Sequence, residues 1–249
     1  MTTRLFSSHA IKSVARPARW ATAAACLALV AGCATGPGAS PVDPFEPFNR
    51  GVTRFNDTVD EAVLEPVAST YQKVVPSLVR QGVTNFFSNI GDVWSLANNV
   101  AQLKLQNSAE TFMRLNVNTF FGLGGLLDVA TEARLPRHEE DFGQTLGYWG
   151  VGAGPYIVLP LLGPSTLRDT VAKPLELYGD AQGYIHDVAW RNSLSALRVV
   201  DTRSRYLGAT RLLDEAALDK YSFTRDAFLQ RRRNQVYDGN PPDDDNAGK

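Results

Sequence analysis

The chain has 249 residues, of which 44% are hydrophobic and 20% are charged, enough for one large domain or two small ones. The formal net charge is −1, and removing residues 1–32, which hold four basic and no acidic residues, leaves (25 − 4) − 26 = −5. A chain with this negative charge does not attract nucleic acid, so we expect no nucleic-acid partner.

Residues 1–32 are typical of a lipoprotein signal peptide. Residues 20–31 form an apolar run too short to span a bilayer, and small residues precede Cys33. The region before this run carries only basic charges, on Arg4, Lys12, Arg16 and Arg19. We predict cleavage before Cys33 and lipidation of its thiol, with an ordinary secretory signal as the alternative. The residue after Cys33 is Ala34 and not the aspartate that usually retains a lipoprotein at the inner membrane, so we expect an outer-membrane location. Cys26 lies in the removed segment, so no internal disulfide is expected.

The rest of the chain divides into a tether, a folded domain and a tail. Residues 33–42 are rich in Gly, Pro, Ser and Ala and are expected to form a flexible tether behind the lipidated cysteine. Residues 238–249 contain no large apolar side chain and are expected to form a disordered acidic tail. We therefore place a single folded domain at residues 43–237.

Apolar residues of this domain recur at helical spacing. The stripe over residues 45–63 is rich in phenylalanine and includes Phe45, Phe48 and Phe55. A face buried in the core is the simplest interpretation of such a stripe, and a face turned toward lipid is the alternative. The same spacing predicts helices over residues 79–90, 107–121, 187–200, 202–218 and 222–236. No segment alternates convincingly with period two, so the sequence predicts a mostly helical domain.

Residues 142–167 form a central segment of 26 residues without a charge. As an unbroken helix it would be about 39 Å long, enough to cross a bilayer. Six glycines and three prolines interrupt it, and each proline removes a backbone donor and clashes with the preceding turn. Irregular backbone lies at membrane depth only under protein cover or beside a wet cavity. Two interpretations stay open, a segment at the membrane interface and a buried crossing of the core.

The mature chain contains no recognisable motif for nucleotide, hydrolase or metal chemistry. The glycines of residues 150–154 are followed by Pro155, where a dinucleotide loop needs its third glycine. Ser165 lacks the second glycine of a nucleophile elbow, and neither His138 nor His186 lies in a motif. The aspartates of the tail lack the spacing of a calcium loop. We therefore expect no enzyme activity, no cofactor and no metal site.

Three consecutive arginines lie near the end of the last predicted helix, at Arg231, Arg232 and Arg233. Cations at a helix C-terminus interact favourably with the helix dipole, which predicts a solvated helix end. Contact with anionic lipid headgroups is the alternative interpretation.

Four blocks of sequence stand out along the domain. The first is DPFEPFNR at residues 43–50, which Phe55 and Asn56 continue. The others are RLNVNTFFGLGGLLDVA at residues 114–130, DFGQTLGYWGVGAGPYIVLPLLGPSTLRD at 141–169 and YSFTRDAFLQRR at 221–232. In this order the blocks resemble the MlaA family, also called VacJ, of outer-membrane phospholipid-transport lipoproteins. The resemblance runs from residue 43 to about residue 237.

The resemblance implies a fold and a function. The fold is an all-α, ring-shaped single domain, embedded in the inner leaflet of the outer membrane around an amphipathic channel. Its function is to maintain outer-membrane lipid asymmetry, removing mislocalised phospholipids from the outer leaflet and passing them to the periplasmic carrier MlaC. A trimeric porin is the other implied partner. A structural or scaffolding lipoprotein without a channel is the alternative.

The resemblance also suggests site residues. The glycine-rich part of the central segment is expected to supply the channel wall or lipid contacts, at Gly147, Tyr148, Gly150, Gly152, Gly154, Pro155 and Tyr156. The phenylalanine-rich stripe is expected to face the membrane through Phe45, Phe48 and Phe55.

Overall fold

The structure is a computed structural model that describes residues 42–242. The predicted signal peptide, the lipidated Cys33, nearly all of the tether and residues 243–249 of the tail lie outside the described residues. Most of the described chain is helical, as the sequence predicts, with one small pair of strands in the central segment.

The domain begins with a long helical rod made of α2 (Glu46–Val59), the π-helix η1 (Asp60–Leu64) and α3 (Glu65–Val74). Pro66 has no backbone N–H, so it cannot continue the normal hydrogen-bond ladder. The Glu65 N–H donates to Asp60 O, five residues earlier, and this π-turn keeps the rod continuous. The helix predicted over residues 45–63 is confirmed and extended.

The next two helices, α4 (Ser77–Ala101) and α5 (Leu105–Phe120), form a helical hairpin. The helices predicted over residues 79–90 and 107–121 are thereby confirmed. The chain leaves α5 through Gly124 and Gly125, whose φ angles of 72° and 92° lie in the left-handed region. A Cβ at Gly125 would clash with Asn89 of α4, so glycine permits this close approach. The short helix α6 (Val129–Glu132) follows.

The central segment folds into α7 (Phe142–Tyr148), β1 (Tyr156–Leu159) and β2 (Gly163–Thr166), and α8 (Leu167–Gly179) follows. The two strands are antiparallel, with Tyr156 opposite Thr166 and Leu159 opposite Gly163. This hairpin was not predicted, because all four residues of β1 are apolar and give no period-two alternation. The apolar run between Pro155 and Pro160 is the signal that favours a short buried strand.

The chain ends with the 3₁₀ turn η2 (Ala181–Tyr184), α9 (Val188–Ala216) and α10 (Lys220–Val236). The predicted boundary between residues 200 and 202 is wrong, because α9 runs through it without a break. Asp201, which lies at this predicted boundary, is 2% exposed and accepts hydrogen bonds from Tyr71 and Thr84 on two other helices. Its polar side chain is therefore part of the packing.

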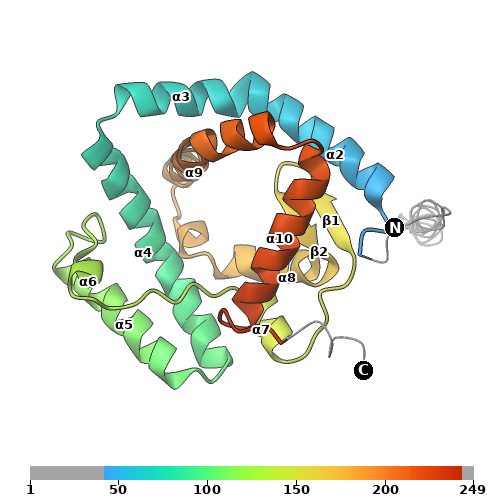
Figure 1. The fold of residues 1–249 in the computed structure, drawn as a ribbon. Helices are drawn as coiled ribbons and strands as arrows, with labels where there is room; N and C mark the ends of the chain where they lie inside the picture. The colour runs from blue at the N-terminus through green and yellow to red at the C-terminus, as the bar shows by residue number, and fades with distance from the viewer. Residues whose placement is uncertain (1–41, 243–249) are drawn as a thin grey trace, which may run out of the picture.

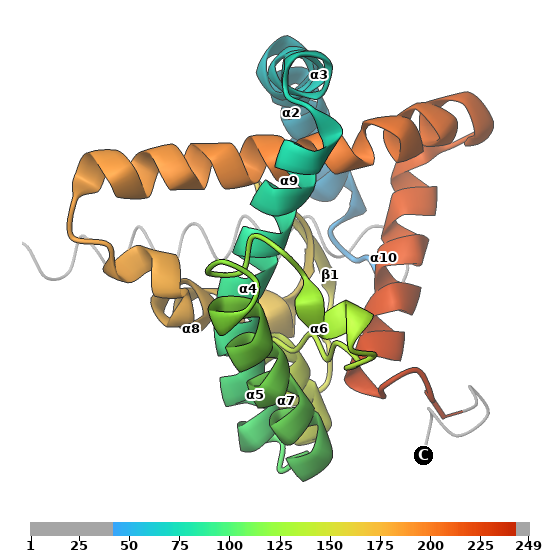
Figure 2. The same ribbon diagram turned by 90° about the vertical axis from the view of Figure 1, so that its left-hand side faces the viewer.

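The helices are arranged as a frame around the hairpin and α8 (Figure 1). The rod of α2 and α3 forms one side of the frame, and α4 continues from its end. The last helix, α10, passes over the hairpin and packs against α7 and β2. The view in Figure 2 shows α9 crossing beneath the rod, with the α4–α5 hairpin projecting away from it. Contacts of α9 with α3 and α4 hold these parts together.

Polar side chains fill much of the interior, whereas many large apolar side chains face outward. Among the described residues, buried polar and charged side chains outnumber buried apolar ones. The apolar core cluster is small and consists of Tyr156, Val158 and Tyr221 with their neighbours. This arrangement reverses the usual one for a globular protein, in which charged side chains are rarely buried unless paired. Within residues 42–242, no helix has both the length and the apolar character that a membrane crossing needs.

Candidate functional site

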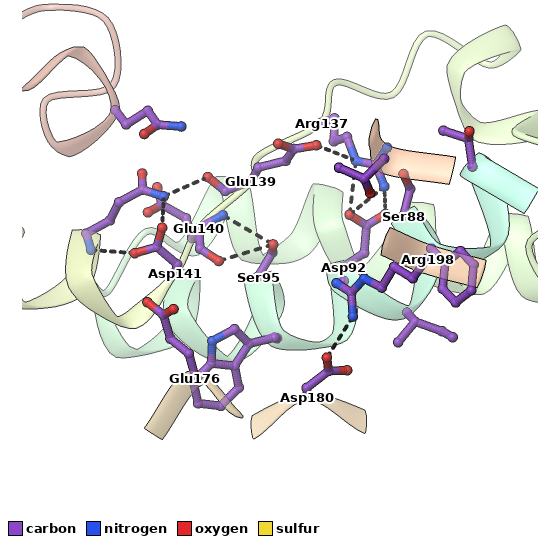
Figure 3. Close-up of a pocket in the computed structure, with 18 of the residues that line it drawn as sticks. Ser88, Asp92, Ser95, Arg137, Glu139, Glu140, Asp141, Glu176, Asp180 and Arg198 are labelled. Carbon is purple, nitrogen blue, oxygen red and sulfur yellow. Dashed lines mark hydrogen bonds and ion pairs between the residues drawn. The ribbon is translucent and has the colours of Figure 1, made fainter. Parts of the chain in front are cut away.

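A central cavity of about 530 Å³ lies between α4, the linker at residues 137–141, α8, α9 and α10. Figure 3 shows polar and charged side chains of these elements around it. They are Ser88, Asp92, Ser95, Arg137, Glu139, Glu140, Asp141, Glu176, Asp180 and Arg198. Aromatic and aliphatic side chains, among them Phe87, Trp94 and Leu177, complete the wall. The cavity is therefore amphipathic, with charge predominating.

Two further hollows adjoin the central cavity. The linker hollow, of about 770 Å³, lies between residues 137–140 and α10. The hairpin hollow, of about 230 Å³, lies between β2, α8 and α10. Arg231 and Gln235 line all three spaces. The three spaces therefore meet along one face of α10.

Ion pairs across the central cavity fix its wall. Arg137 from the linker donates through Nε and Nη2 to Asp92 of α4, at 3.0 to 3.1 Å. Asp92 is 2% exposed, and its burial raises the pKa of the carboxyl despite the lowering effect of Arg137. Near this pair, Arg198 of α9 donates to Asp180 at 2.6 Å (Figure 3). Each pair joins two elements that are distant in sequence.

Arg232 of α10 joins the starts of two helices. Its guanidinium donates two hydrogen bonds of 2.6 Å to Asp141, and bonds of 2.8 and 3.0 Å to Asp169. Asp141 also caps α7 by accepting from the Gln144 N–H, and Asp169 lies in the first turn of α8. Burial alone would raise the pKa of Asp141, but the hydrogen bonds from Arg232 hold it below its ordinary value. A Cβ at Gly143 would clash with this group, which explains the glycine.

A second buried network lies beneath α7. Gln102 donates to Glu140 Oε2 at 2.8 Å and to Thr145 Oγ1 at 3.0 Å, and Lys104 Nζ donates to Glu140 Oε1 at 2.9 Å. Thr145 in turn donates to Asn98 Oδ1 at 2.8 Å. Burial raises the pKa of Glu140, although Gln102 and Lys104 act to lower it. This network attaches α7 to the end of α4.

Two asparagines of the first sequence block bind the free edge of β1. Asn49 Nδ2 donates to Tyr156 O at 3.0 Å, and its Oδ1 accepts from the Val158 N–H at 2.9 Å. Asn56, two helical turns later, donates to Leu159 O at 3.0 Å and accepts from the Leu161 N–H at 2.8 Å. The helix thus satisfies backbone groups that an edge strand would leave unpaired. This pairing brings the first and third sequence blocks together.

The residues predicted to form a channel wall lie outside the three hollows and are Gly147, Tyr148, Gly150, Gly152, Gly154, Pro155 and Tyr156. Gly150 and Gly152 are exposed, with open space where a Cβ would lie. Tyr156 is 1% exposed and packs against Tyr221 and Phe228. The structure therefore places Tyr156 in the core and not on an accessible wall, because this face of β1 packs against α2 and α10. Lipid contact by the exposed members stays a prediction.

The central segment instead reaches the hollows near its two ends. Gln144 lines the central cavity and the linker hollow, and Pro164 and Ser165 line the hairpin hollow. Most residues of the cavity wall were not predicted from the sequence, because charged residues on a helix are usually expected to face solvent. A signal was present at Asp92, which lies next to the apolar residues Val93 and Trp94.

The three phenylalanines expected to face the membrane lie on or just before α2. Phe48 and Phe55 are 52% and 51% exposed, whereas Phe45 is half-buried. Val52, one helical turn from Phe48, packs against the core cluster instead. The core interpretation therefore holds for Val52, and contact of the exposed phenylalanines with the membrane stays a prediction.

The residues weighed for hydrolase chemistry are not brought together as a nucleophile and base. Ser165 Oγ contacts Thr166 O at 3.2 Å and Thr170 Oγ1 at 3.0 Å. His138 Nε2 is paired with Glu110 at 2.5 Å, and His186 is exposed. Within residues 42–242, no group of three or more His, Cys, Asp or Glu side chains is arranged to hold a metal ion.

The fold and the cavity define a class of mostly helical protein with a polar, hollow interior and an apolar exterior. Comparison with known proteins identifies the family within that class. The family model described as MlaA lipoprotein matches residues 41–235. The chain therefore belongs to the MlaA lipoprotein family, as the four sequence blocks predict.

Relatives of known name agree with this assignment. The intermembrane phospholipid transport system lipoprotein MlaA of Escherichia coli is 34% identical over 195 residues, covering 76% of each chain. The protein of the same name from Haemophilus influenzae is 31% identical over 206 residues, covering 79% of this chain and 80% of its own. A relative from Rickettsia felis is 39% identical over 127 residues, and there the match spans only about half of each chain (51%).

One solved structure has the same fold. That structure addresses the structural basis for maintenance of bacterial outer membrane lipid asymmetry, and its sequence is 34% identical to this chain. The superposition has a TM-score of 0.68 and covers 80% of this chain and 99% of the other. The similarity therefore extends over the whole helical frame, including the elements that surround the central cavity.

Proposed function

We propose that this protein is an outer-membrane lipoprotein that maintains lipid asymmetry by removing mislocalised phospholipids from the outer leaflet. Phospholipids enter the hollow interior of a helical ring and pass to the periplasmic carrier MlaC. The ring lies in the inner leaflet, anchored by the lipidated Cys33 on the periplasmic face of the outer membrane, next to a trimeric porin. The names of the relatives and the description of the solved structure support phospholipid as the transported molecule and the outer membrane as the location. The residues that line the hollow interior support the path.

One observation carries the proposal: charged side chains surround an interior cavity while large apolar side chains cover the outside. A phospholipid has a charged headgroup and apolar chains, so its path needs a wall that can solvate the headgroup. The exposed residues Phe120, Phe121 and Leu123 on the α5 side are 70 to 76% exposed, which suits contact with acyl chains. No bond is made or broken in such transport, so no catalytic group is required.

The cavity can be blocked without disturbing its ion pairs. Ser88 lines the central cavity and its side chain has no hydrogen-bond partner in the described part of the chain (Figure 3). Ser88→Trp should fill part of the space, and outer-leaflet phosphatidylethanolamine should rise in a strain that carries this variant alone. An impermeant amine-reactive reagent measures that pool in whole cells. Ser193→Trp, on an exposed part of α9 outside the hollows, is the matched control and should behave as wild type.

The alternative is a structural lipoprotein whose cavity has no transport role. It predicts that Ser88→Trp acts only through protein abundance, measured by immunoblot of outer membranes. Normal outer-leaflet composition at normal abundance of Ser88→Trp would contradict the transport proposal. Site-specific crosslinking with Phe120 replaced by a photoreactive residue would then show whether lipid or protein covers this surface.

A further inference from the structure

Arg231 lies on the face of α10 where the three hollows meet. It lines the central cavity, the linker hollow and the hairpin hollow, and so does Gln235, one turn further along α10. Residues four apart lie on the same face of a helix, so both side chains border the region where the three spaces meet. Any solute that moves from one hollow to another passes this face.

Every other charged side chain that lines the hollows has a partner of opposite charge. In the central cavity these pairs include Asp92 with Arg137, Lys173 with Glu176 and Asp180 with Arg198. Arg205 pairs with Asp201, and Glu140 and Asp238 share Lys104. Arg231 has no ion pair or hydrogen bond from its side chain to any residue between 42 and 242. It is the unpaired cation of an otherwise neutralised wall.

The neighbouring residues explain why Arg231 stays unpaired. Arg232, next in sequence, projects about 100° further round the helix and takes both nearby carboxylates, Asp141 and Asp169. Gln235 accepts from Arg232 Nη1 through its Oε1 at 3.4 Å, which leaves its Nε2 donors unused by the described residues. The face of α10 toward the hollows therefore offers a guanidinium and an amide, both donors, and no competing carboxylate on the same turn.

A fork of guanidinium donors beside an amide donor matches the oxygens of a phosphate group. We infer that Arg231, assisted by Gln235, binds the phosphate of a phospholipid headgroup as the lipid passes between the hollows. This inference rests on the proposed function and assigns a recognition residue to it. Free phosphate offers the same chemistry, and the experiment below separates the two sources.

The test uses the mature lipoprotein in a phosphate-free detergent and three probes measured by titration calorimetry. Dihexanoylphosphatidylethanolamine carries both parts of a lipid, dihexanoylglycerol lacks the phosphate, and inorganic phosphate lacks the chains. Arg231→Gln should weaken binding of the phospholipid about tenfold, the size expected for a charge-assisted hydrogen bond, and leave dihexanoylglycerol unchanged. Arg231→Lys should restore part of the affinity. Arg211→Gln, on an exposed part of α9 outside the hollows, is the matched control.

The outcomes distinguish this inference from the proposal it rests on. Equal phospholipid affinity for wild type and Arg231→Gln overturns the inference and leaves the transport proposal standing. Equal affinity of wild type for inorganic phosphate and for phospholipid shows a general anion site and also overturns it. Failure of wild type to bind any of the lipids overturns both. Arg231 is exposed, so circular dichroism should show that the variant folds normally.

Discussion

Two regions of the molecule are each held by a buried arginine but differ in the number of carboxylates that this arginine binds. In the block of α7, the hairpin, α8 and α10, Arg168, Asp169 and Arg232 are at most 8% exposed. In the arm that contains α5 and α6, Phe120 and Phe121 are 76% and 74% exposed. Each region is nevertheless held by a buried arginine, because Arg114 of α5 pairs with Asp128 before α6 as Arg232 pairs with Asp141. Both regions also expose large apolar side chains, among them Val171 and Leu177 in the block. The regions therefore differ in their ion pairs, because Arg232 binds two carboxylates and Arg114 binds one.

Breaking the pairs of the block should have the largest effect. Arg232→Met keeps much of the side-chain volume but leaves Asp141 without a counter-charge and Asp169 with Arg168 alone. Loss of one partner from a buried ion pair costs about 3–5 kcal/mol, so the free energy of unfolding should fall by that order. Urea denaturation in detergent, followed by tryptophan fluorescence, measures the change.

The adjacent arginine provides the control for this experiment. Arg231→Met removes an exposed cation without a partner, so its effect should stay within about 0.5 kcal/mol. Similar losses for the two variants would mean that the environment assigned to Arg232 is incorrect.

A smaller effect is expected where α2 binds the hairpin. Asn49→Ala removes the amide from Tyr156 O and Val158 N, and these buried backbone groups then lack a partner. An unsatisfied buried group costs about 1–3 kcal/mol, and the same denaturation experiment measures it. Asn56→Ala should cost less, because Leu161 is exposed and water can replace the lost bond. A larger loss for Asn56→Ala than for Asn49→Ala would reverse this order.

The smallest effect is expected for apolar side chains on the arm. Phe120→Ser should change the unfolding free energy in detergent by no more than about 0.5 kcal/mol, because this ring contributes little to the packed interior. Phe87→Ser is the matched comparison, since Phe87 is 6% exposed and truncating a buried phenylalanine costs about 3–5 kcal/mol. A strong loss for Phe120→Ser would show that the ring is packed, against the arrangement described above.

Prolines and glycines in the sequence predicted those helix ends that such local signals determine. Pro76 precedes α4, and the glycines after residue 121 follow α5, so the start of α4 and both ends of α5 lie close to their predicted positions. The end of α4 lies at Ala101, well beyond the predicted residue 90. The hairpin was missed because all four residues of β1 are apolar, so the sequence shows no alternation although the burial of the strand alternates. The unbroken α9 was missed because Asp201 accepts hydrogen bonds from two distant helices, which local spacing cannot indicate.

The candidate site was harder to predict than the fold. Its pairs join residues far apart in the chain, such as Asp92 with Arg137 and Asp141 with Arg232. The sequence does not distinguish the environments of Arg231 and Arg232. In the structure, however, Arg232 is buried between carboxylates and Arg231 borders the hollows. Such a distinction depends on which side of α10 packs against α7 and α8, and the amphipathic pattern of α10 is too weak to show it.

The backbone contact between Val42 and the hairpin limits where the protein can act. The Tyr156 N–H donates to Val42 O at 3.0 Å, so the chain is fastened to β1 at the first described residue. Nine peptide steps, 42 − 33 = 9, separate this point from Cys33, and a fully extended chain of that length reaches about 32 Å at most. With Cys33 lipidated as proposed, this length keeps Val42, and with it the start of β1, within about 32 Å of the anchoring leaflet, whatever path the tether takes.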